Sequence, residues 1–193
     1  MITHIQGKLT EKNPTSVVID CNGVGYMINI SLHTFSQIPD SEHLKLYTHL
    51  QVKEDSHSLF GFSSLAEREI FRLLISVSGI GSSIARTMLS SLTPKQVREG
   101  IAVGDVALIQ SIKGIGAKTA QRVILDLKDK VLKIYDIDEV SVSKDNTNKD
   151  EALSALEVLG FMKKQVERVV DKIMVSDPNA SVENIIKQAL KNL

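Results

Sequence analysis

A glycine-rich sequence occurs twice in this chain of 193 residues, as SGIGSSIA at residues 78–85 and as KGIGAKTA at residues 113–120. Apolar stretches with helical spacing precede and follow each copy, which predicts a helix, a tight turn and a second helix. Glycine permits the tight turn and leaves room for the close approach of a phosphate. The unpaired N–H groups at the start of the second helix would then face that phosphate, and the helix dipole favours its charge.

The repeated unit is therefore predicted to be a tandem helix-hairpin-helix motif, which holds a nucleic-acid backbone without reading bases. Ile80 and Ile115 are expected to fix the two hairpins to the core. A single Gly-x-Gly between helices is often only a turn, but two copies in the same frame make that alternative much weaker. The candidate DNA-binding residues are Gly79, Gly81, Ser82, Ser83, Arg86, Gly114, Gly116, Lys118, Thr119 and Arg122.

Other phosphate-binding motifs fail on their spacing. A Walker motif needs glycine directly before the lysine, whereas Ala117 precedes Lys118, and Ser111 stands five residues before Gly116. The dinucleotide fingerprint lacks its third glycine in both copies. Cys21 is the single cysteine, which excludes a disulfide framework and a multi-cysteine zinc site. We expect no ATP hydrolysis, no catalytic residues, no metal site and no cofactor in this chain.

The charges argue against a general polyanion binder, because 23 basic and 23 acidic residues give a net charge of +0. Residues 1–63 carry 4 basic and 6 acidic side chains, whereas residues 64–140 carry 11 basic and 9 acidic ones. Nucleic-acid binding by the middle part would thus depend on geometry and local charge. The amino terminus lacks a signal-peptide core, and no apolar run approaches about 20 residues, so we expect a cytoplasmic protein.

Residues 1–62 are predicted to form short strands. Residues 17–21 and 26–30 alternate in polarity, and between them lies Asn22-Gly23, the pair that a type I′ hairpin turn prefers. Alternation returns at residues 44–50, and residues 59–62 complete the pattern. Roughly five strands in about sixty residues predict a small OB-type barrel, with a small sandwich as the alternative.

The chain is thus predicted to be a multidomain α+β protein. The expected parts are a five-stranded barrel domain (1–63), an all-α tandem helix-hairpin-helix domain (64–141), a flexible linker (142–148) and a three-helix module (149–193). Within the second part, Thr93 is predicted to cap a helix that starts at Pro94, with Gln96 completing a capping box. The linker is assigned because this stretch has too few apolar residues to bury enough surface to offset the entropy lost on ordering.

This order of parts resembles the RuvA family, the junction-binding subunits of the bacterial Holliday junction branch-migration complex. The resemblance covers the full chain. It extends to particular sequences: Met1-Ile2 with Gly7, GVGY at 23–26, Glu54-Asp55 followed by LFGF at 59–62, GIG at 114–116 with Lys118-Thr119-Ala120, and Leu159-Gly160-Phe161.

The resemblance implies a non-catalytic homotetramer that holds an open four-way (Holliday) junction in DNA recombination and repair. Glu54 and Asp55 match the family's acidic pin near the crossover, where carboxylates repel phosphates. The terminal module resembles the part that docks RuvB, a hexameric ATPase that uses ATP and Mg²⁺. The resemblance leaves open whether one tetramer or two bind the junction and whether the RuvC resolvase joins the complex. The residues that match RuvB-contacting positions are Leu156, Leu159, Phe161 and Leu190; a leucine stripe at helical spacing is more often core.

The chain departs from the family at two positions, Ser83 and Ala117, where the family often has lysine. Fewer charges predict a shallower salt dependence, with Arg86 as a compensating residue. Two other hypotheses remain open at this point. A DNA-repair enzyme could use the same hairpins as anchors, although Asp126 on the second helix has no clustered carboxylate. A protein adaptor would use the hairpins only as turns.

Overall fold

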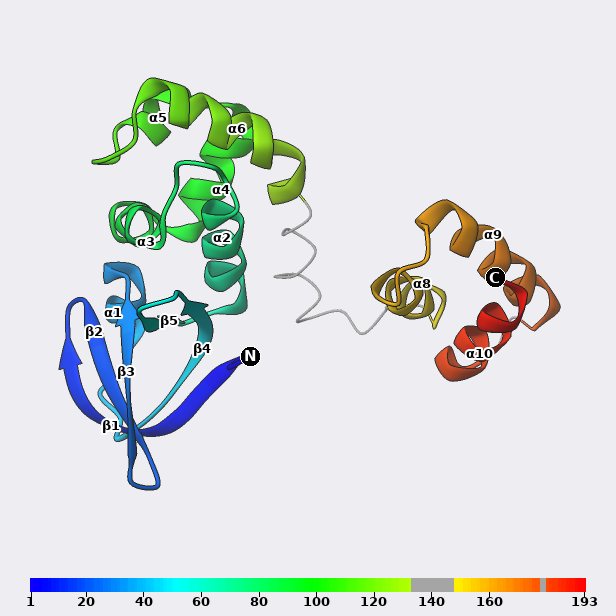
Figure 1. The fold of residues 1–193 in the computed structure, drawn as a ribbon, viewed down its shortest axis with the longest axis horizontal. Coiled ribbons are helices and arrows are strands. Elements are labelled where there is room, and N and C mark those ends of the chain that lie inside the picture. The colour runs from blue at the N-terminus through cyan, green and yellow to red at the C-terminus, as the bar shows by residue number, and fades with distance from the viewer. Residues whose placement is uncertain (133–147, 178–179) are drawn as a thin grey trace. The chain divides into compact units, whose positions relative to one another are not determined.

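The computed structural model describes residues 1–132, 148–177 and 180–193, and the chain divides into two compact units (Figure 1). The first unit contains a β-barrel followed by a group of helices, and the second contains three helices. This is the mixed α and β architecture that the sequence predicts.

A closed five-stranded barrel forms the start of the chain, in the strand order β1-β2-β3-β5-β4. Only β3 and β5 pair in parallel; the other neighbours, including the closing pair β1 and β4, are antiparallel. The barrel therefore confirms the OB-type prediction over the sandwich. Its strands are β1 (His4–Asn13), β2 (Ser16–Cys21), β3 (Val24–Ile30), β4 (His43–Val52) and β5 (His57–Phe62).

The Asn-Gly turn between β2 and β3 has the predicted conformation, with φ of 55° at Asn22 and 92° at Gly23. One element in this region was not predicted, the short helix α1 (Leu32–Gln37) between β3 and β4. Ser31 caps it by accepting a hydrogen bond from the Thr34 N–H. Because α1 is so short, it leaves no clear helical period in the sequence.

Strand β5 joins the barrel to the helices because its two faces pack in different cores. A Cβ at Gly61 would lie 2.6 Å from Ile28 Cγ2, so this glycine faces the tightly packed barrel interior. Phe60 and Phe62 instead pack on Phe71 of the first long helix, with ring centroids 5.1 and 4.9 Å apart. This aromatic contact packs the barrel against the helices within the first unit.

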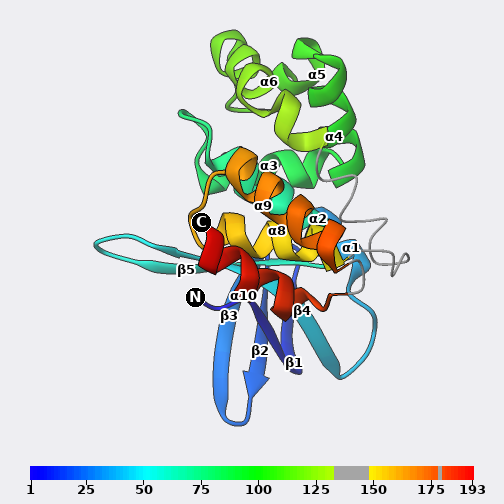
Figure 2. The same ribbon diagram turned by 90° about the vertical axis from the view of Figure 1, so that its right-hand side faces the viewer.

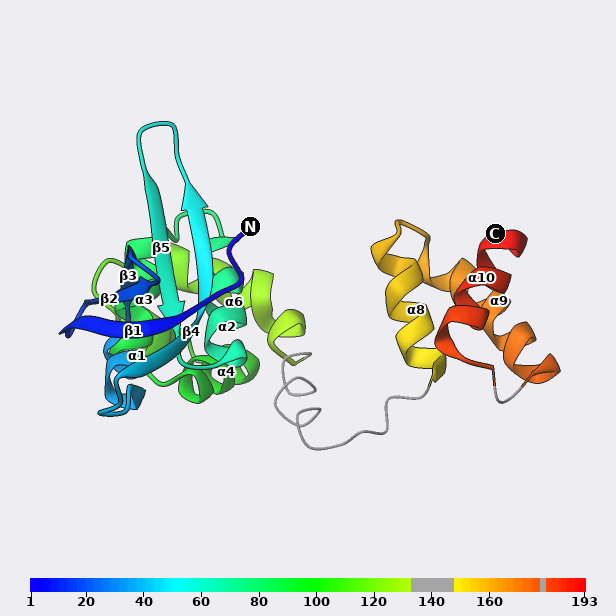
Figure 3. The same cartoon turned by 90° about the horizontal axis from the view of Figure 1, so that it is seen from below.

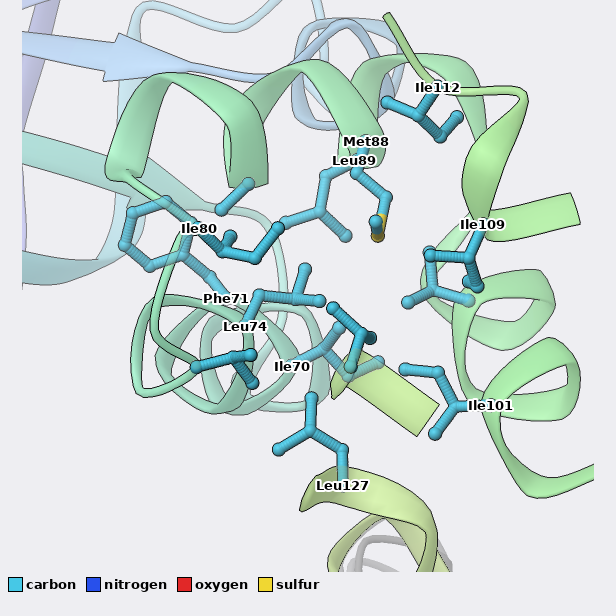
Figure 4. Packing of buried hydrophobic residues seen from close by; sticks show 14 of the residues in the cluster. Ile70, Phe71, Leu74, Ile80, Met88, Leu89, Ile101, Ile109, Ile112 and Leu127 are labelled. Atoms are coloured by element: carbon cyan, nitrogen blue, oxygen red, sulfur yellow. The ribbon is translucent and has the colours of Figure 1, made fainter. Parts of the chain in front are cut away.

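The helical part of the first unit surrounds a continuous apolar core (Figure 4). The predicted capping box is present, because the Thr93 side chain accepts from the Gln96 N–H and Gln96 accepts from the Thr93 N–H. The helices are α2 (Leu65–Ile75), α3 (Ser82–Ser91), α4 (Pro94–Val103), α5 (Val106–Gln110) and α6 (Ala117–Leu132).

The second unit has its own core, to which all three of its helices contribute. Residues 142–147 of the predicted linker lie outside the described residues, and Asn148 is the first residue of α8. Within the described ranges, no helix is long and apolar enough to cross a membrane. The helices of this unit are α8 (Asn148–Val158), α9 (Lys163–Ser176) and α10 (Val182–Asn192).

Candidate nucleic-acid interface

The two Gly-Ile-Gly turns have the same local geometry. Gly79 and Gly114 have φ of 97° and 95°, a region that glycine adopts without steric cost. In each turn the isoleucine N–H donates to a carbonyl three residues earlier, at 3.0 Å in both cases. Ile80 and Ile115 are both buried, which confirms that they fix the turns to the core.

Each turn delivers the start of a helix to the surface. The first backbone hydrogen bonds of α3 and α6 run from Ala85 to Gly81 and from Ala120 to Gly116, at 3.0 and 2.9 Å. The N–H groups of the first turn of each helix therefore have no partner along the helix. No side chain in the described part of the chain caps α3 at Gly81. An anion can thus approach these N–H groups directly.

The space beside the second glycine of each turn is open. An added Cβ at Gly81 or Gly116 would meet no heavy atom within 4 Å among the described residues. These two glycines are exposed and do not have positive φ, so neither packing nor backbone conformation requires them. The open space leaves room for the close approach of a phosphate.

The predicted side chains of the second motif lie at the surface. Lys118 is exposed in the first turn of α6, and Thr119 is partly buried beside it. Arg122, one turn further, is exposed and donates to the Ser78 carbonyl at 3.4 Å. Arg122 therefore joins the second motif to the first hairpin.

The predicted side chains of the first motif divide between two environments. Ser83 is exposed. Ser82 and Arg86 instead form hydrogen bonds with the barrel: Ser82 with Gln51 at 2.9 Å and Arg86 with Asn29 at 2.9 Å. Neither barrel residue carried a sequence signal, because polar residues on strands are ordinary and their partners lie at least 31 residues away.

The acidic pair occupies the tip of the β4–β5 hairpin, which projects beyond the barrel (Figures 2 and 3). Glu54 and Asp55 are both exposed. The tip is closed by a hydrogen bond from the Lys53 N–H to the Ser56 carbonyl, at 2.8 Å. Two carboxylates are thus held in water at the end of an extended arm.

The four candidate partner-binding residues of the second unit differ in exposure. Leu156 is fully buried in the core between the helices. Phe161 is partly buried and packs against that core. Leu159 and Leu190 are 59% and 46% exposed, so these two present apolar side chains at the surface of the unit.

Three family models match the chain in the order of these parts. The RuvA N-terminal domain matches residues 1–61, a SAM-like helix-hairpin-helix tandem matches residues 71–129, and the RuvA C-terminal domain matches residues 147–193.

Curated relatives match over the full chain. The chain is 69% identical to proteins named Holliday junction branch migration complex subunit RuvA from Flavobacterium psychrophilum and Christiangramia forsetii, covering all of each protein. It is 42% identical to the protein of that name from Geobacter sulfurreducens, over 100% of this chain and 99% of the relative.

Proposed function

The chain belongs to the RuvA family, and we propose that it binds four-way (Holliday) junctions as the DNA-holding subunit of a branch-migration complex. The observation that carries the proposal is the combination, in one compact unit, of two matching Gly-Ile-Gly hairpins, each leading into a helix, and a projecting acidic tip. The N–H groups at the hairpins can bind phosphates, whereas the carboxylates of the tip repel them. A surface of this kind favours branched DNA over a uniform backbone.

In this proposal each hairpin holds the backbone of a DNA arm. The N–H groups at the starts of α3 and α6 donate to phosphate oxygens, and Lys118 adds a charge-assisted contact. None of these groups reads a base, so recognition depends on the shape of the junction. Because basic and acidic residues nearly balance over the chain, its affinity for ordinary duplex DNA is expected to be low.

Glu54 and Asp55 act at the crossover as the acidic pin. Their carboxylates repel the nearby phosphates, which keeps the exchanging strands apart and helps to hold the junction open. Four copies of the chain, one for each arm, give the four-fold arrangement that the four-way junction requires.

The second unit recruits the motor, for which we propose the hexameric ATPase RuvB. Exposed Leu159 and Leu190 supply apolar contact surface, with Phe161 beside them. Movement of the junction is then driven by ATP and Mg²⁺ bound to the partner, in the cytoplasm. This chain contributes no cofactor and no catalytic group.

The test is incubation of the purified chain with a synthetic four-way junction in Mg²⁺, followed by native and denaturing gels. The proposal predicts a retarded complex whose DNA strands remain intact. Cleaved strands would instead indicate a DNA-repair enzyme, and the absence of a retarded complex would indicate a protein adaptor. When the RuvB ATPase and ATP are then added, we expect the junction to dissociate into two duplexes.

A further inference from the structure

One face of helix α3 is hydrogen-bonded to the barrel along its whole length. Ser82, Arg86 and Ser90 are spaced four residues apart, so they share one side of the helix. All three form hydrogen bonds with barrel or α1 residues far away in the sequence. We call these three residues the α3 seam.

The first contact of the seam is made at the start of α3. Ser82 Oγ donates to Gln51 Oε1 at 2.9 Å, and this contact is partly buried. Gln51 lies on β4, three residues before Glu54. A hydroxyl in the first turn of α3 is therefore bonded to the strand that leads to the acidic tip.

The second contact is the most extensive. Arg86 Nη1 donates to Asn29 Oδ1 at 2.9 Å and to the Thr15 carbonyl at 3.4 Å. Asn29 in turn donates through Nδ2 to the Leu59 carbonyl of β5, at 3.2 Å. Leu59 lies on the strand that returns from the tip, so the arginine is connected to that arm through Asn29.

The third contact closes the seam at the end of α3. The Leu32 N–H, at the start of α1, donates to Ser90 Oγ at 3.1 Å. Ser90 Oγ donates to the Arg86 carbonyl at 2.8 Å, which leaves its lone pairs directed at α1. The start of α3 is thus hydrogen-bonded to the barrel and its end to α1.

The seam therefore contacts β4 directly through Gln51 and β5 indirectly, because Asn29 donates to the Leu59 carbonyl. The two strands are paired at this point, with Gln51 opposite Ser58 and Leu50 opposite Leu59. The same helix begins with the N–H groups of the first hairpin. A single rigid helix thus connects a phosphate-binding site to the base of a phosphate-repelling arm.

We propose that the α3 seam sets the position of the acidic tip relative to the first hairpin, and that Ser82 and Arg86 are positioning residues. This inference rests on the proposed junction binding. It assigns to Arg86 a role in choosing branched DNA, because its guanidinium is already bonded to Asn29 and Thr15. Duplex DNA does not need the tip and the hairpin in register, whereas a junction does.

The test compares Arg86→Met and Asn29→Ala with the unchanged protein, using a four-way junction and a linear duplex at several salt concentrations. Loss of the Arg86–Asn29 hydrogen bond, which either variant removes, predicts a roughly two- to tenfold fall in junction affinity. Duplex affinity and the salt dependence of binding are expected to stay unchanged. The double variant should lose less than the sum of the two single losses, because both substitutions break the Arg86–Asn29 contact.

A direct phosphate contact by Arg86 predicts a different pattern, which would overturn the inference. Arg86→Met would then lower affinity for both DNAs and reduce the salt slope by about one per contact, while Asn29→Ala would change neither. Unchanged junction affinity in both variants would also overturn it. Lys118→Ala is the matched control, since loss of a phosphate-binding charge should weaken both DNAs.

Two smaller substitutions test the inference in case Arg86→Met or Asn29→Ala disturbs the fold. Ser82→Ala and Gln51→Ala remove the first contact and leave Arg86 in place, and both should lower junction preference in the same direction. Thermal unfolding of each variant identifies any general loss of structure. If the unchanged protein itself shows no junction preference, the proposed function fails. If it shows preference and all four single variants at the seam and its barrel partners keep it, only the seam inference fails.

Discussion

Gly79 packs directly against Thr119, so that a Cβ added to this glycine would lie 3.7 Å from Thr119 Cγ2. The equivalent glycine of the second motif, Gly114, faces Ile84 Cγ1 at the same 3.7 Å. Ile84 and Thr119 occupy matching positions in the two copies of the repeat. Each hairpin therefore rests on the helix that follows the other hairpin, and the two motifs form a reciprocal pair.

This arrangement predicts that Gly79→Ala lowers stability through the backbone alone. The space at Gly79 accommodates a methyl group at ordinary contact distance, but φ of 97° disfavours any residue with a Cβ. The expected loss is about 1–2 kcal/mol in the free energy of unfolding. Chemical denaturation measures it, with exposed Ser83→Ala as the control. An equally stable Gly79→Ala protein would contradict the assigned turn geometry.

Gly81→Asp separates DNA binding from stability. Aspartate is a favourable N-cap and Gly81 has φ of −87°, so thermal stability should be retained or raised. The new carboxylate would occupy the N–H groups of α3 and repel phosphates, so affinity for both junction and duplex should fall at least about tenfold. Gly81→Asn is the matched neutral control. Unchanged affinity in Gly81→Asp would show that phosphates do not bind at this helix.

Removal of the acidic tip charges should strengthen DNA binding. Glu54→Gln with Asp55→Asn keeps the size of both side chains and removes their repulsion of phosphates. We expect higher affinity for the junction in a gel-shift titration and an altered rate of ATP-driven migration. Glu11→Gln, at an exposed position of β1, removes one negative charge away from the tip and is the control for each of the two single substitutions. Weaker binding by the double variant would argue against the pin assignment.

The leucines of the second unit should separate into two classes. Leu159→Ser with Leu190→Ser changes exposed side chains, so the unit should stay folded while recruitment of the ATPase is lost. Leu156→Ala empties a fully buried position and should cost about 2–5 kcal/mol. Pull-down of the ATPase and thermal unfolding measure the two effects. Normal recruitment by the Leu159/Leu190 variant would place the contact elsewhere.

The lowered pKa of His49 predicts that the protein loses stability in mild acid. Burial lowers the pKa of His49 from 6.5, and nearby Arg72 and Arg68 lower it further. The unfolded chain therefore takes up the proton first, so this contribution is complete above about pH 6.5 and is lost as the pH falls through the lower, folded-state pKa. The melting temperature should drop between about pH 7.5 and about pH 5.5, and less in His49→Gln. Equal drops in both proteins would contradict this.

The sequence predicted the features that depend on neighbouring residues. The repeated turns, the Asn22-Gly23 hairpin and the Thr93 capping box all follow from local backbone preferences, and the structure confirms them. The barrel was predictable because alternation in polarity marks each strand. Of the elements in the barrel region, α1 was too short to give a period.

Contacts between distant residues could not be predicted from the sequence. Phe60 and Phe62 read as ordinary strand residues, yet they pack in the helical core because β5 has the barrel on its other side. Arg86 fitted the pattern of a DNA-binding side chain by its place in the repeat. Its bonds to Asn29 and Thr15 depend on how α3 lies on the barrel, which no local pattern encodes.

The proposed function requires that this chain selects the shape of a four-way junction. A gel-shift titration of the unchanged protein measures that preference, with a synthetic four-way junction and a linear duplex of equal length at two salt concentrations. We expect strong preference for the junction at both concentrations, with modest sensitivity to salt. Equal affinity for the two DNAs would contradict it, because the hairpins would then be general backbone contacts.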